Sequence, residues 1–483
     1  MTYNIWGVAD PNLKLDLSDK YKINLVEDYM FHYFLSDETI YTIKRSFEKE
    51  FEDGLKRFEV LDTVYDMISK PQNPNTLGMK VTFFTEFFNG TENGEFIVIH
   101  LNRRHLLLIL AKVKPGFPVE TKRDYFIVND NIRRSPYIQI FEYICDCMMK
   151  FFSKHKLFNK RQTVGFCTDL PFIQFGIDHA IVWYFSERAT DFPLNCYDIN
   201  RCFEMVLLKD KYRYLKIKLV VILSNNTSMF INSCYLCGKI DMFLNLADDC
   251  DLLYLEKPIR VKKWKVSNSE VDSILIDTEL RNFGANGCMD FIATDLEWLA
   301  VTTSSSNDKR ARLEKFVSEQ YVLELIKHVL TDLHHRLLYC RNTTLETMQS
   351  KGISLTELCD FANMKDLEHA ATVLPGGIIG GSTDDVKIAA YVCKVLLIRA
   401  AVLTSICVSS VLLRFLRDDF VIAVNSPMLR KYPDYETYVR NLIGKFAPEK
   451  KFQLLWTEDS FSLNGAALAT SIANRLDRTT LHF

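Results

Sequence analysis

Two cysteine pairs have spacings that occur in metal and redox sites. Two residues separate Cys234 from Cys237, as in a zinc half-site or a redox pair, and one residue separates Cys145 from Cys147. A structural zinc site needs four ligands, and no second close Cys or His pair stands at a usual spacing. Cys145 and Cys147 fall in an expected helix, where residues two apart face in different directions. We therefore expect both pairs to be structural and predict no metal site.

A histidine pair and a glycine-rich turn are the other isolated signals. His334 and His335 stand at the end of an expected helix, where a cation suits the helix dipole. The glycines of residues 376–381 could offer backbone amides to a phosphate, but the turn lacks the Lys-Ser/Thr ending of a P-loop. A helix-capping role and a plain loop are the simpler interpretations, and neither motif alone predicts a function.

Composition places the chain among ordinary globular proteins. It has 483 residues, 48% hydrophobic and 25% charged, which at roughly 100–200 residues per domain predicts two to four domains. Lys and Arg number 59 and Asp and Glu 61, so the net charge is −2. Because a near-neutral chain lacks the basic field that holds phosphates, no nucleic-acid partner is predicted.

Targeting signals are also weak. Residues 1–20 are polar, so a secretory signal peptide is not expected. The most lipid-like segment, residues 400–413, lies between Arg399 and Arg414 and is shorter than the about 20 residues that a membrane span needs. We expect a buried helix there and no membrane span. The 13 scattered cysteines fit a reducing compartment, so a cytoplasmic location is predicted.

Hydrophobic periodicity predicts the elements that would position a site. Apolar residues at three- and four-residue steps predict helices over 36–54, 138–155, 313–339, 386–417 and 466–476. Short apolar runs predict strands over 96–99, 106–110, 162–166, 216–223, 242–246, 420–424 and 452–455. Strands alternating with helices indicate an α/β chain with mixed sheets.

Several short patterns occur in one order along the chain. They are Val164-Gly165-Phe166 with Pro171, Gly176-Ile177-Asp178-His179, Phe283-Gly284, Asn286-Gly287-Cys288-Met289-Asp290, Glu314-Lys315-Phe316, Arg399-Ala400-Ala401 and Gly465-Ala466-Ala467-Leu468. In this order and approximate spacing, they resemble the hexokinase family along nearly the whole chain. The resemblance implies an α/β fold with two domains of the actin-like ATPase, ribonuclease H-like type.

The family's domain pattern implies four segments. Residues 1–75 would be the N-terminal helical part of the large domain, and residues 76–222 the small domain. Residues 223–465 would complete the large domain, and residues 466–483 would be a C-terminal helix that returns to the small domain.

The implied family reaction moves the γ-phosphoryl group of ATP to the 6-hydroxyl of a hexose. Such chemistry needs a base for the hydroxyl proton and Mg²⁺ to neutralise phosphate charge. The implied ligands are therefore Mg-ATP and a glucose-like hexose.

The catalytic position departs from the family pattern. Asn225 stands where the family has its catalytic Asp, and an amide cannot take a proton from the sugar hydroxyl. Glu279 and Glu314 keep two carboxylates that can accept hydrogen bonds from vicinal sugar hydroxyls. The implied sugar-binding positions are Asp169, Ser186, Glu187, Ser224, Asn225, Glu279 and Glu314.

The implied phosphate loops have also changed. Asn102 and Arg103 replace two glycines of the first loop, and His100 replaces an acid that helps to hold the metal. Two acids replace the second loop's glycine-rich pattern, where like charges would repel phosphate. The implied nucleotide-binding positions are Asn102, Arg103, Arg104, Asp248, Asp249, Asn425 and Ser426.

Three interpretations follow. The first is a catalytically impaired member of the family that binds hexose weakly or acts as a scaffold or regulator of a protein partner. The second is an active ATP:hexose 6-phosphotransferase with a relocated base, for which Asp169 is the candidate. The third is an interaction module without a ligand, in which Arg103, Arg104 or Phe172 blocks the cleft.

Overall fold

The computed structural model describes most of the chain. The described residues are 4–56, 76–102, 104–133, 135–170, 172–182, 197–247, 249–264, 271–303, 311–364, 366–372, 374–375, 378, 381–457 and 462–480.

A five-stranded sheet has the order β4-β3-β2-β5-β9. Its strands are β2 (Gly94–Leu101), β3 (His105–Val113), β4 (Glu120–Ile127), β5 (Gln162–Thr168) and β9 (Ile217–Ser224). Strands β2, β3 and β4 pair antiparallel, whereas β5 pairs parallel with both β2 and β9. The carboxyl ends of β2, β5 and β9 therefore lie at one edge of the sheet.

A six-stranded sheet has the order β1-β12-β11-β10-β13-β14. Its strands are β1 (Lys80–Val81), β10 (Met242–Asn245), β11 (Asp251–Glu256), β12 (Ile274–Asp277), β13 (Asp419–Asn425) and β14 (Lys451–Trp456). A three-stranded sheet has the order β6-β7-β8. Its strands are β6 (Phe172–Gln174), β7 (Ala180–Val182) and β8 (Tyr197–Asp198).

Helices connect and cover these strands. The α-helices before residue 300 begin with α1 (Asn4–Ala9), α2 (Lys20–Met30), α3 (Asp37–Lys56), α5 (Asp130–Arg133), α6 (Tyr137–His155), α7 (Ile199–Leu207), α8 (Asn225–Cys237) and α9 (Asp295–Thr303). The later ones are α10 (Glu314–Val317), α11 (Glu319–His335), α12 (Leu345–Ser350), α13 (Leu355–Asn363), α14 (Leu367–Thr372), α15 (Thr383–Leu413), α16 (Pro427–Lys431), α17 (Tyr435–Phe446) and α18 (Ser462–Thr480). Short 3₁₀ helices are η1 (Phe31–Tyr33), η2 (Asp210–Tyr212), η3 (Pro258–Arg260), η4 (Leu280–Asn282) and η5 (Asp290–Ile292).

The chain divides into two compact units. Unit 1 comprises Met1–Met79, Leu244–Leu252 and Thr278–Trp456, and unit 2 comprises Lys80–Phe243, Leu253–Asp277 and Thr457–Phe483. The division brings the C-terminal helix α18 into the same unit as β2 and β5. The domain boundaries that follow the family pattern, at residues 75, 222 and 465, stay a prediction.

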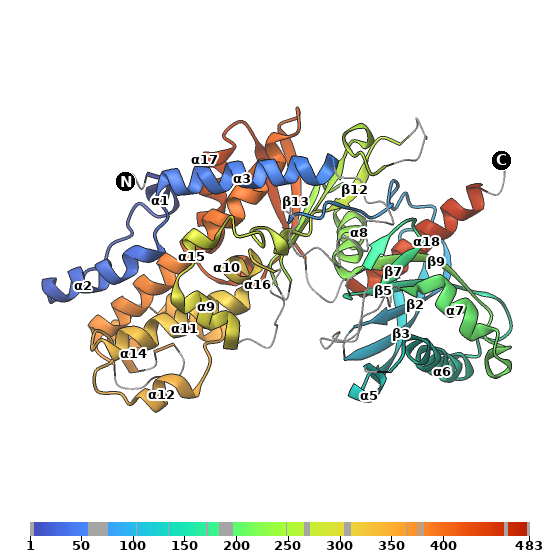
Figure 1. Cartoon of the computed structure of the whole chain (residues 1–483), viewed down its shortest axis with the longest axis horizontal. Helices are drawn as coiled ribbons and strands as arrows, with labels where there is room; N and C mark the ends of the chain where they lie inside the picture. The colour runs from blue at the N-terminus through green and yellow to red at the C-terminus, as the bar shows by residue number, and fades with distance from the viewer. Residues whose placement is uncertain are drawn as a thin grey trace. The chain divides into compact units, whose positions relative to one another are not determined.

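Unit 2 is a layered structure around the five-stranded sheet (Figure 1). Val164 and Phe166 of β5 lie in a core that includes apolar residues of α6 and α7. Gly165 points to the opposite face because side chains alternate along a strand. A Cβ on Gly165 would come within 2.0 Å of Thr470 Oγ1, so α18 packs directly on the sheet at this glycine.

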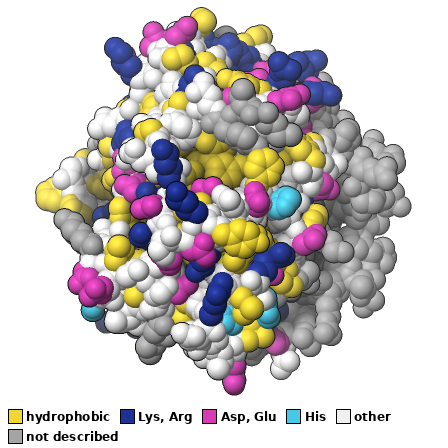
Figure 2. Space-filling model, turned by 90° about the vertical axis from the view of Figure 1, so that its left-hand side faces the viewer, with side chains coloured by type: hydrophobic (Ala, Val, Ile, Leu, Met, Phe, Trp, Pro, Cys, Tyr) yellow, Lys and Arg dark blue, Asp and Glu magenta, His cyan; other side chains and the backbone are white. Residues whose placement is uncertain are grey.

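Unit 1 is built around the long helix α15, drawn in orange in Figure 1, which packs against α3, α11 and α17. Ser382 caps α15, and its hydroxyl accepts a hydrogen bond from the backbone of Asp385 at 3.1 Å. On the face viewed from the side of α2, basic and acidic side chains are interspersed (Figure 2). This face carries no single-sign field of the kind that attracts a polyanion.

The long helix predicted over 386–417 and the burial predicted for its apolar part are both confirmed by α15. The apolar run at residues 400–413 belongs to a helix of 31 residues, which is long and apolar enough to cross a membrane. The most apolar window of this helix is 100% buried within the structure, as in the core helix of a globular unit.

The other predicted elements are confirmed, with shifted ends. The helix expected over 313–339 is two helices, α10 and α11, because Ser318 between them has an extended backbone with ψ 149°. Strands β2, β3, β5, β9, β10, β13 and β14 and helices α3, α6 and α18 all overlap their predicted ranges.

Candidate functional site

The position predicted for the catalytic base lies at the junction of β9 and α8. Ser224 ends the strand and caps the helix, and its hydroxyl accepts a hydrogen bond from the backbone of Thr227 at 3.1 Å. Asn225 is the first residue of the helix. Because β2, β5 and β9 run parallel, residues at their carboxyl ends can meet Asn225.

Two neutral side chains contact the Asn225 amide oxygen. His100 Nε2, on β2, lies 2.8 Å from Asn225 Oδ1, and Cys167 Sγ, on β5, lies 3.2 Å from the same atom. Burial lowers the pKa of His100 and raises that of the Cys167 thiol. The neutral imidazole therefore donates from Nε2, and the amide oxygen at the catalytic position is already used as an acceptor.

This cluster does not fit a magnesium ion or a general base. Mg²⁺ prefers carboxylate, phosphate and water oxygens, whereas His100 and Cys167 direct hydrogens at Asn225. A general base needs a group that can accept a proton near neutral pH, and an amide cannot do so. No phosphoryl-transfer step can be assigned to these side chains.

The described backbone amides of the turn between β2 and β3 form hydrogen bonds within the turn. Asn102 Oδ1 accepts hydrogen bonds from the backbone nitrogens of Arg104 at 3.0 Å and His105 at 2.7 Å, and Asn102 N donates to His105 O at 2.9 Å. This arrangement is a closed Asx-type turn. The backbone amides of Asn102, Arg104 and His105 are therefore already paired within the turn.

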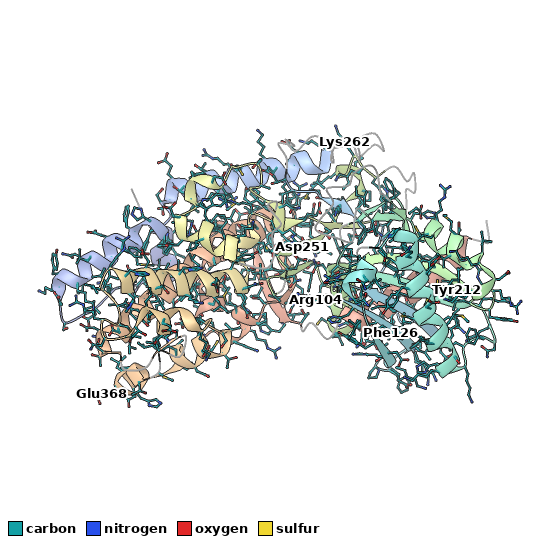
Figure 3. All side chains as sticks on the ribbon, turned by 60° about the horizontal axis from the view of Figure 1, so that its bottom comes forward. Arg104, Phe126, Tyr212, Asp251, Lys262 and Glu368 are labelled. Atoms are coloured by element: carbon teal, nitrogen blue, oxygen red, sulfur yellow. The ribbon has the colours of Figure 1, made fainter. Side chains whose placement is uncertain are left out.

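Arg104 lies on the surface of unit 2 beside this turn and is labelled in Figure 3. With His105 and Arg133 it lines an open hollow of about 590 Å³. Both Arg133 and Asp130 line this hollow and form an ion pair, so the positive charge of Arg133 is already neutralised. Phe172, a candidate for blocking a cleft, is instead part of the core of unit 2.

In unit 1, Glu279 has a strained backbone. Its φ of 53° places a non-glycine residue in the left-handed region. Its carboxylate lies so close to the backbone of Gly78 that a Cβ there would come within 1.7 Å of Glu279 Oε2. Strain of this kind occurs at functional sites, where the surrounding structure enforces it.

Glu314 lies in the same unit at the start of α10. Its side chain is 8% exposed, and Glu314 Oε2 forms an ion pair with Arg281 Nη2 at 3.0 Å. Arg281 Nη1 also lies 3.4 Å from Asp249 Oδ1. A single guanidinium therefore joins a predicted sugar carboxylate to a predicted phosphate-loop acid.

Buried arginines hold the segment that carries Glu314. Arg399 of α15 pairs with Glu297 of α9 and donates to the carbonyl oxygen of Ile292. Arg312 pairs with Asp290 at 2.8 Å, and its guanidinium lies 4.0 Å from the ring centroid of Trp298. These contacts fix the approach of the chain to α10.

The implied nucleotide-binding residues Asn425 and Ser426 also form hydrogen bonds within unit 1. Asn425 Nδ2 donates to Asn245 Oδ1 at 3.0 Å, and that oxygen also accepts from Ala247 N at 3.2 Å. Ser426 caps α16 by accepting from Leu429 N at 3.2 Å. Asn425 and Ser426 are each 3% exposed, so their polar groups serve the fold.

The structure groups the predicted site residues by unit. Unit 2 holds Asn102, Arg104, Asp169, Ser224 and Asn225, and Asp169 is exposed after β5. Unit 1 holds Asp249, Glu279, Glu314, Asn425 and Ser426. Arg103, Ser186, Glu187 and Asp248 lie outside the described residues, and their predicted roles stay predictions.

Two contacts were missed from the sequence. Cys167 was not among the predicted site residues, and its contact with Asn225 arises from the pairing of β5 with β9. Arg281 stands only two residues after Glu279, but its partner Glu314 lies 33 residues further along the chain, and no short spacing predicts that pair. Cys234 and Cys237 lie on α8 as free thiols.

Comparison with known proteins gives one family. Two family models described as hexokinase match residues 25–235 and 247–472. Human hexokinase-1 is 24% identical over 96% of this chain and 50% of its own length, and human hexokinase-2 is 22% identical over 94% and 49%. The chain therefore spans about half the length of these curated relatives.

Solved structures give the same fold. The hexokinase from Schistosoma mansoni complexed with glucose matches with a TM-score of 0.73 and 18% identity, covering 94% of this chain and 100% of its own. The architecture is the two-domain actin-like ATPase fold, with mixed α/β content. The chain belongs to the hexokinase family.

Proposed function

We propose that this chain is a catalytically impaired hexokinase-family protein that binds a glucose-like hexose weakly, and that binding serves a regulatory or scaffold role. The family reaction is phosphorylation of a hexose. The observation that carries the proposal is the His100–Asn225 pair, because it puts two neutral groups at the position of the family's base. Loss of a general base alone costs about 10²–10⁴-fold in rate.

Hexose binding is supported by the residues of unit 1. Glu279 and Glu314 offer carboxylate oxygens, and the matching Schistosoma mansoni hexokinase was solved with glucose. ATP binding with Mg²⁺, which the family uses in general, has less support here. The backbone amides of Arg104 and His105 and the side-chain amide of Asn425 already donate hydrogen bonds within the chain.

Dialysis of the purified full chain against labelled glucose, and separately against labelled Mg-ATP, tests this proposal. We expect glucose to be retained weakly and Mg-ATP not to be retained. Glu279→Gln and Glu314→Gln should each weaken glucose binding about tenfold or more, because hydrogen bonds to a charged group contribute about 1.5–3 kcal/mol.

Glu436→Gln on the remote helix α17 is the matched control and should bind like the wild type. Glucose binding that survives both substitutions at Glu279 and Glu314, or no glucose binding at all, would contradict the proposal.

The alternative is an active ATP:hexose 6-phosphotransferase with Asp169 as the base. The exposed carboxylate of Asp169 directly follows β5, whose carboxyl end lies at the same sheet edge as Asn225. If the wild type transfers phosphate, Asp169→Asn should abolish transfer under this alternative.

A cytoplasmic location is also proposed. The cysteines of the described residues are free thiols, which fits a reducing compartment. Burial raises the pKa of Cys340 and of Cys393 to about 12, so these thiols resist ionisation. Trapping of free thiols in intact cells with a membrane-permeant alkylating reagent would test this location; disulfide-linked protein would argue against it.

A further inference from the structure

Arg281 occupies a carboxylate that the proposed function assigns to the sugar. It lies on η4, which Asp251 holds in place by accepting a hydrogen bond from Leu280 N at 3.1 Å. Asp251, labelled in Figure 3, is itself 4% exposed. The guanidinium is therefore presented to Glu314 by a fixed turn.

Because Glu314 is buried, its carboxylate depends on this ion pair for charge compensation. A buried carboxylate is costly unless a partner compensates its charge, and the side chain of Glu314 is 8% exposed. Arg281 supplies that compensation at Oε2 from 3.0 Å. A carboxylate that accepts two vicinal hydroxyls uses both of its oxygens. The Arg281 guanidinium already covers Oε2 of a side chain that is only 8% exposed, so a hexose hydroxyl and Arg281 compete for access to that oxygen.

Asp249 gives the guanidinium a second partner. It lies 3.4 Å from Arg281 Nη1, and both side chains are 32% exposed, which leaves them room to move. Arg281 can release Glu314 and keep a charge partner at Asp249. The release therefore costs less than the loss of every ion pair of Arg281 would cost.

We propose that Arg281 is a built-in competitor of the hexose at Glu314, and that Asp249 is the site to which its guanidinium withdraws when sugar binds. This inference rests on the proposed function, and it names the residue that keeps hexose binding weak. Arg281 acts on affinity through Glu314 and is a positioning residue.

Glucose affinity, measured by calorimetry on purified full-length variants, tests this proposal. Arg281→Ala should bind glucose at least about fivefold more tightly, the factor that corresponds to the about 1 kcal/mol of a partly exposed ion pair. Arg281→Lys keeps the cation and should stay close to the wild type. Asp249→Asn removes the withdrawal site and should weaken binding.

A second readout covers the folding of the variants. Glu314 loses its cation in Arg281→Ala, so the sugar-free variant should melt at a lower temperature and glucose should raise its melting temperature more than in the wild type. Arg260 is a partly exposed arginine of unit 2 that pairs with Glu256, and Arg260→Ala is the matched control. It should change neither the glucose affinity nor the rise in melting temperature that glucose causes.

The outcomes separate this inference from the proposed function. Wild-type glucose binding that Arg281→Ala leaves unchanged or weakens would overturn the competitor role and leave the proposed function standing. No glucose binding by the wild type or by Arg281→Ala would overturn both. Tighter binding by Arg281→Ala with weaker binding by Asp249→Asn supports the competition.

Discussion

His100 and Asn225 form a hydrogen-bonded neutral pair at the carboxyl ends of β2 and β9. A neutral pair is stable there because burial disfavours the charged imidazole, and the Cys167 thiol adds a second donor to the amide oxygen. The chemistry of the pair is that of a structural contact rather than of an acid and a base.

The lowered pKa of His100 makes stability depend on pH. In the unfolded chain this histidine should titrate near 6.5, and in the folded chain it titrates below that value. As pH falls below about 6.5 the unfolded chain binds a proton that the folded chain resists, so the free energy of unfolding decreases, by at most about 1.4 kcal/mol per pH unit. Urea unfolding between pH 7.5 and pH 5 should show this loss.

His100→Gln keeps a donor for Asn225 and removes the titration, so its stability should fall less over the same range. His335→Gln, at an exposed position, should follow the wild-type profile. Equal slopes for His100→Gln and the wild type would show that His100 is not the group responsible.

For single residues, the sequence predicted which positions depart from the family pattern but not which side chains contact one another. Asn225 and His100 were recognisable as departures from the family pattern, because the ordered short patterns elsewhere along the chain place these positions. The Asn102 turn and the Arg281–Glu314 ion pair were not predictable. A hydrogen bond within a turn depends on backbone geometry, and an ion pair across 33 residues depends on the packing of η4 against α10.

Among the elements, α18 depends on one glycine for its place in unit 2. A Cβ at Gly465 would come within 1.8 Å of the carbonyl oxygen of Ser228 on α8, a backbone atom that cannot move aside. Gly465→Ala should therefore force α18 away from α8 and destabilise unit 2 by about 1–3 kcal/mol or more. Thermal unfolding followed by circular dichroism would measure this.

Gly444→Ala is the matched control, because Gly444 lies on the exposed side of α17 with nothing within 4 Å of its would-be Cβ. It should stabilise the protein by about 0.5–1 kcal/mol, since alanine favours a helix more than glycine does. Equal effects of the two substitutions would contradict the close packing of α18.

The helices around Glu314 depend on the buried ion pair between Arg399 and Glu297. Both side chains are at most 6% exposed, so Arg399→Ala leaves a buried carboxylate without its cation. We expect a loss of about 3–5 kcal/mol, measured by chemical unfolding. Arg336→Ala, which removes an exposed pair with Asp332, should cost at most about 1 kcal/mol.

A similar loss of stability for the Arg399 and Arg336 variants would contradict the structural role of the buried pair.

The positions of most elements were predictable from the sequence, because apolar spacing marks the buried faces of α3, α6 and β9 directly. The break at Ser318 was not, because the apolar pattern continues across it.

In the molecule as a whole, the chain has the family fold, while polar side chains at its implied ligand positions form hydrogen bonds within the chain. Unit 2 has a close β5–α18 contact at Gly165, and unit 1 has the strained backbone of Glu279. Packing is carried by buried apolar positions, which tolerate change at a polar edge. This separation explains why the fold was predictable from short ordered patterns and the present chemistry was not.

We propose that this protein does not transfer phosphate efficiently. The most direct test is transfer of labelled phosphate from ATP to glucose by the purified full chain in the presence of Mg²⁺, with Asn225→Ala beside it. We expect both proteins to show the same background, because the neutral His100–Asn225 pair offers no base. Transfer by the wild type well above that of Asn225→Ala would contradict the account.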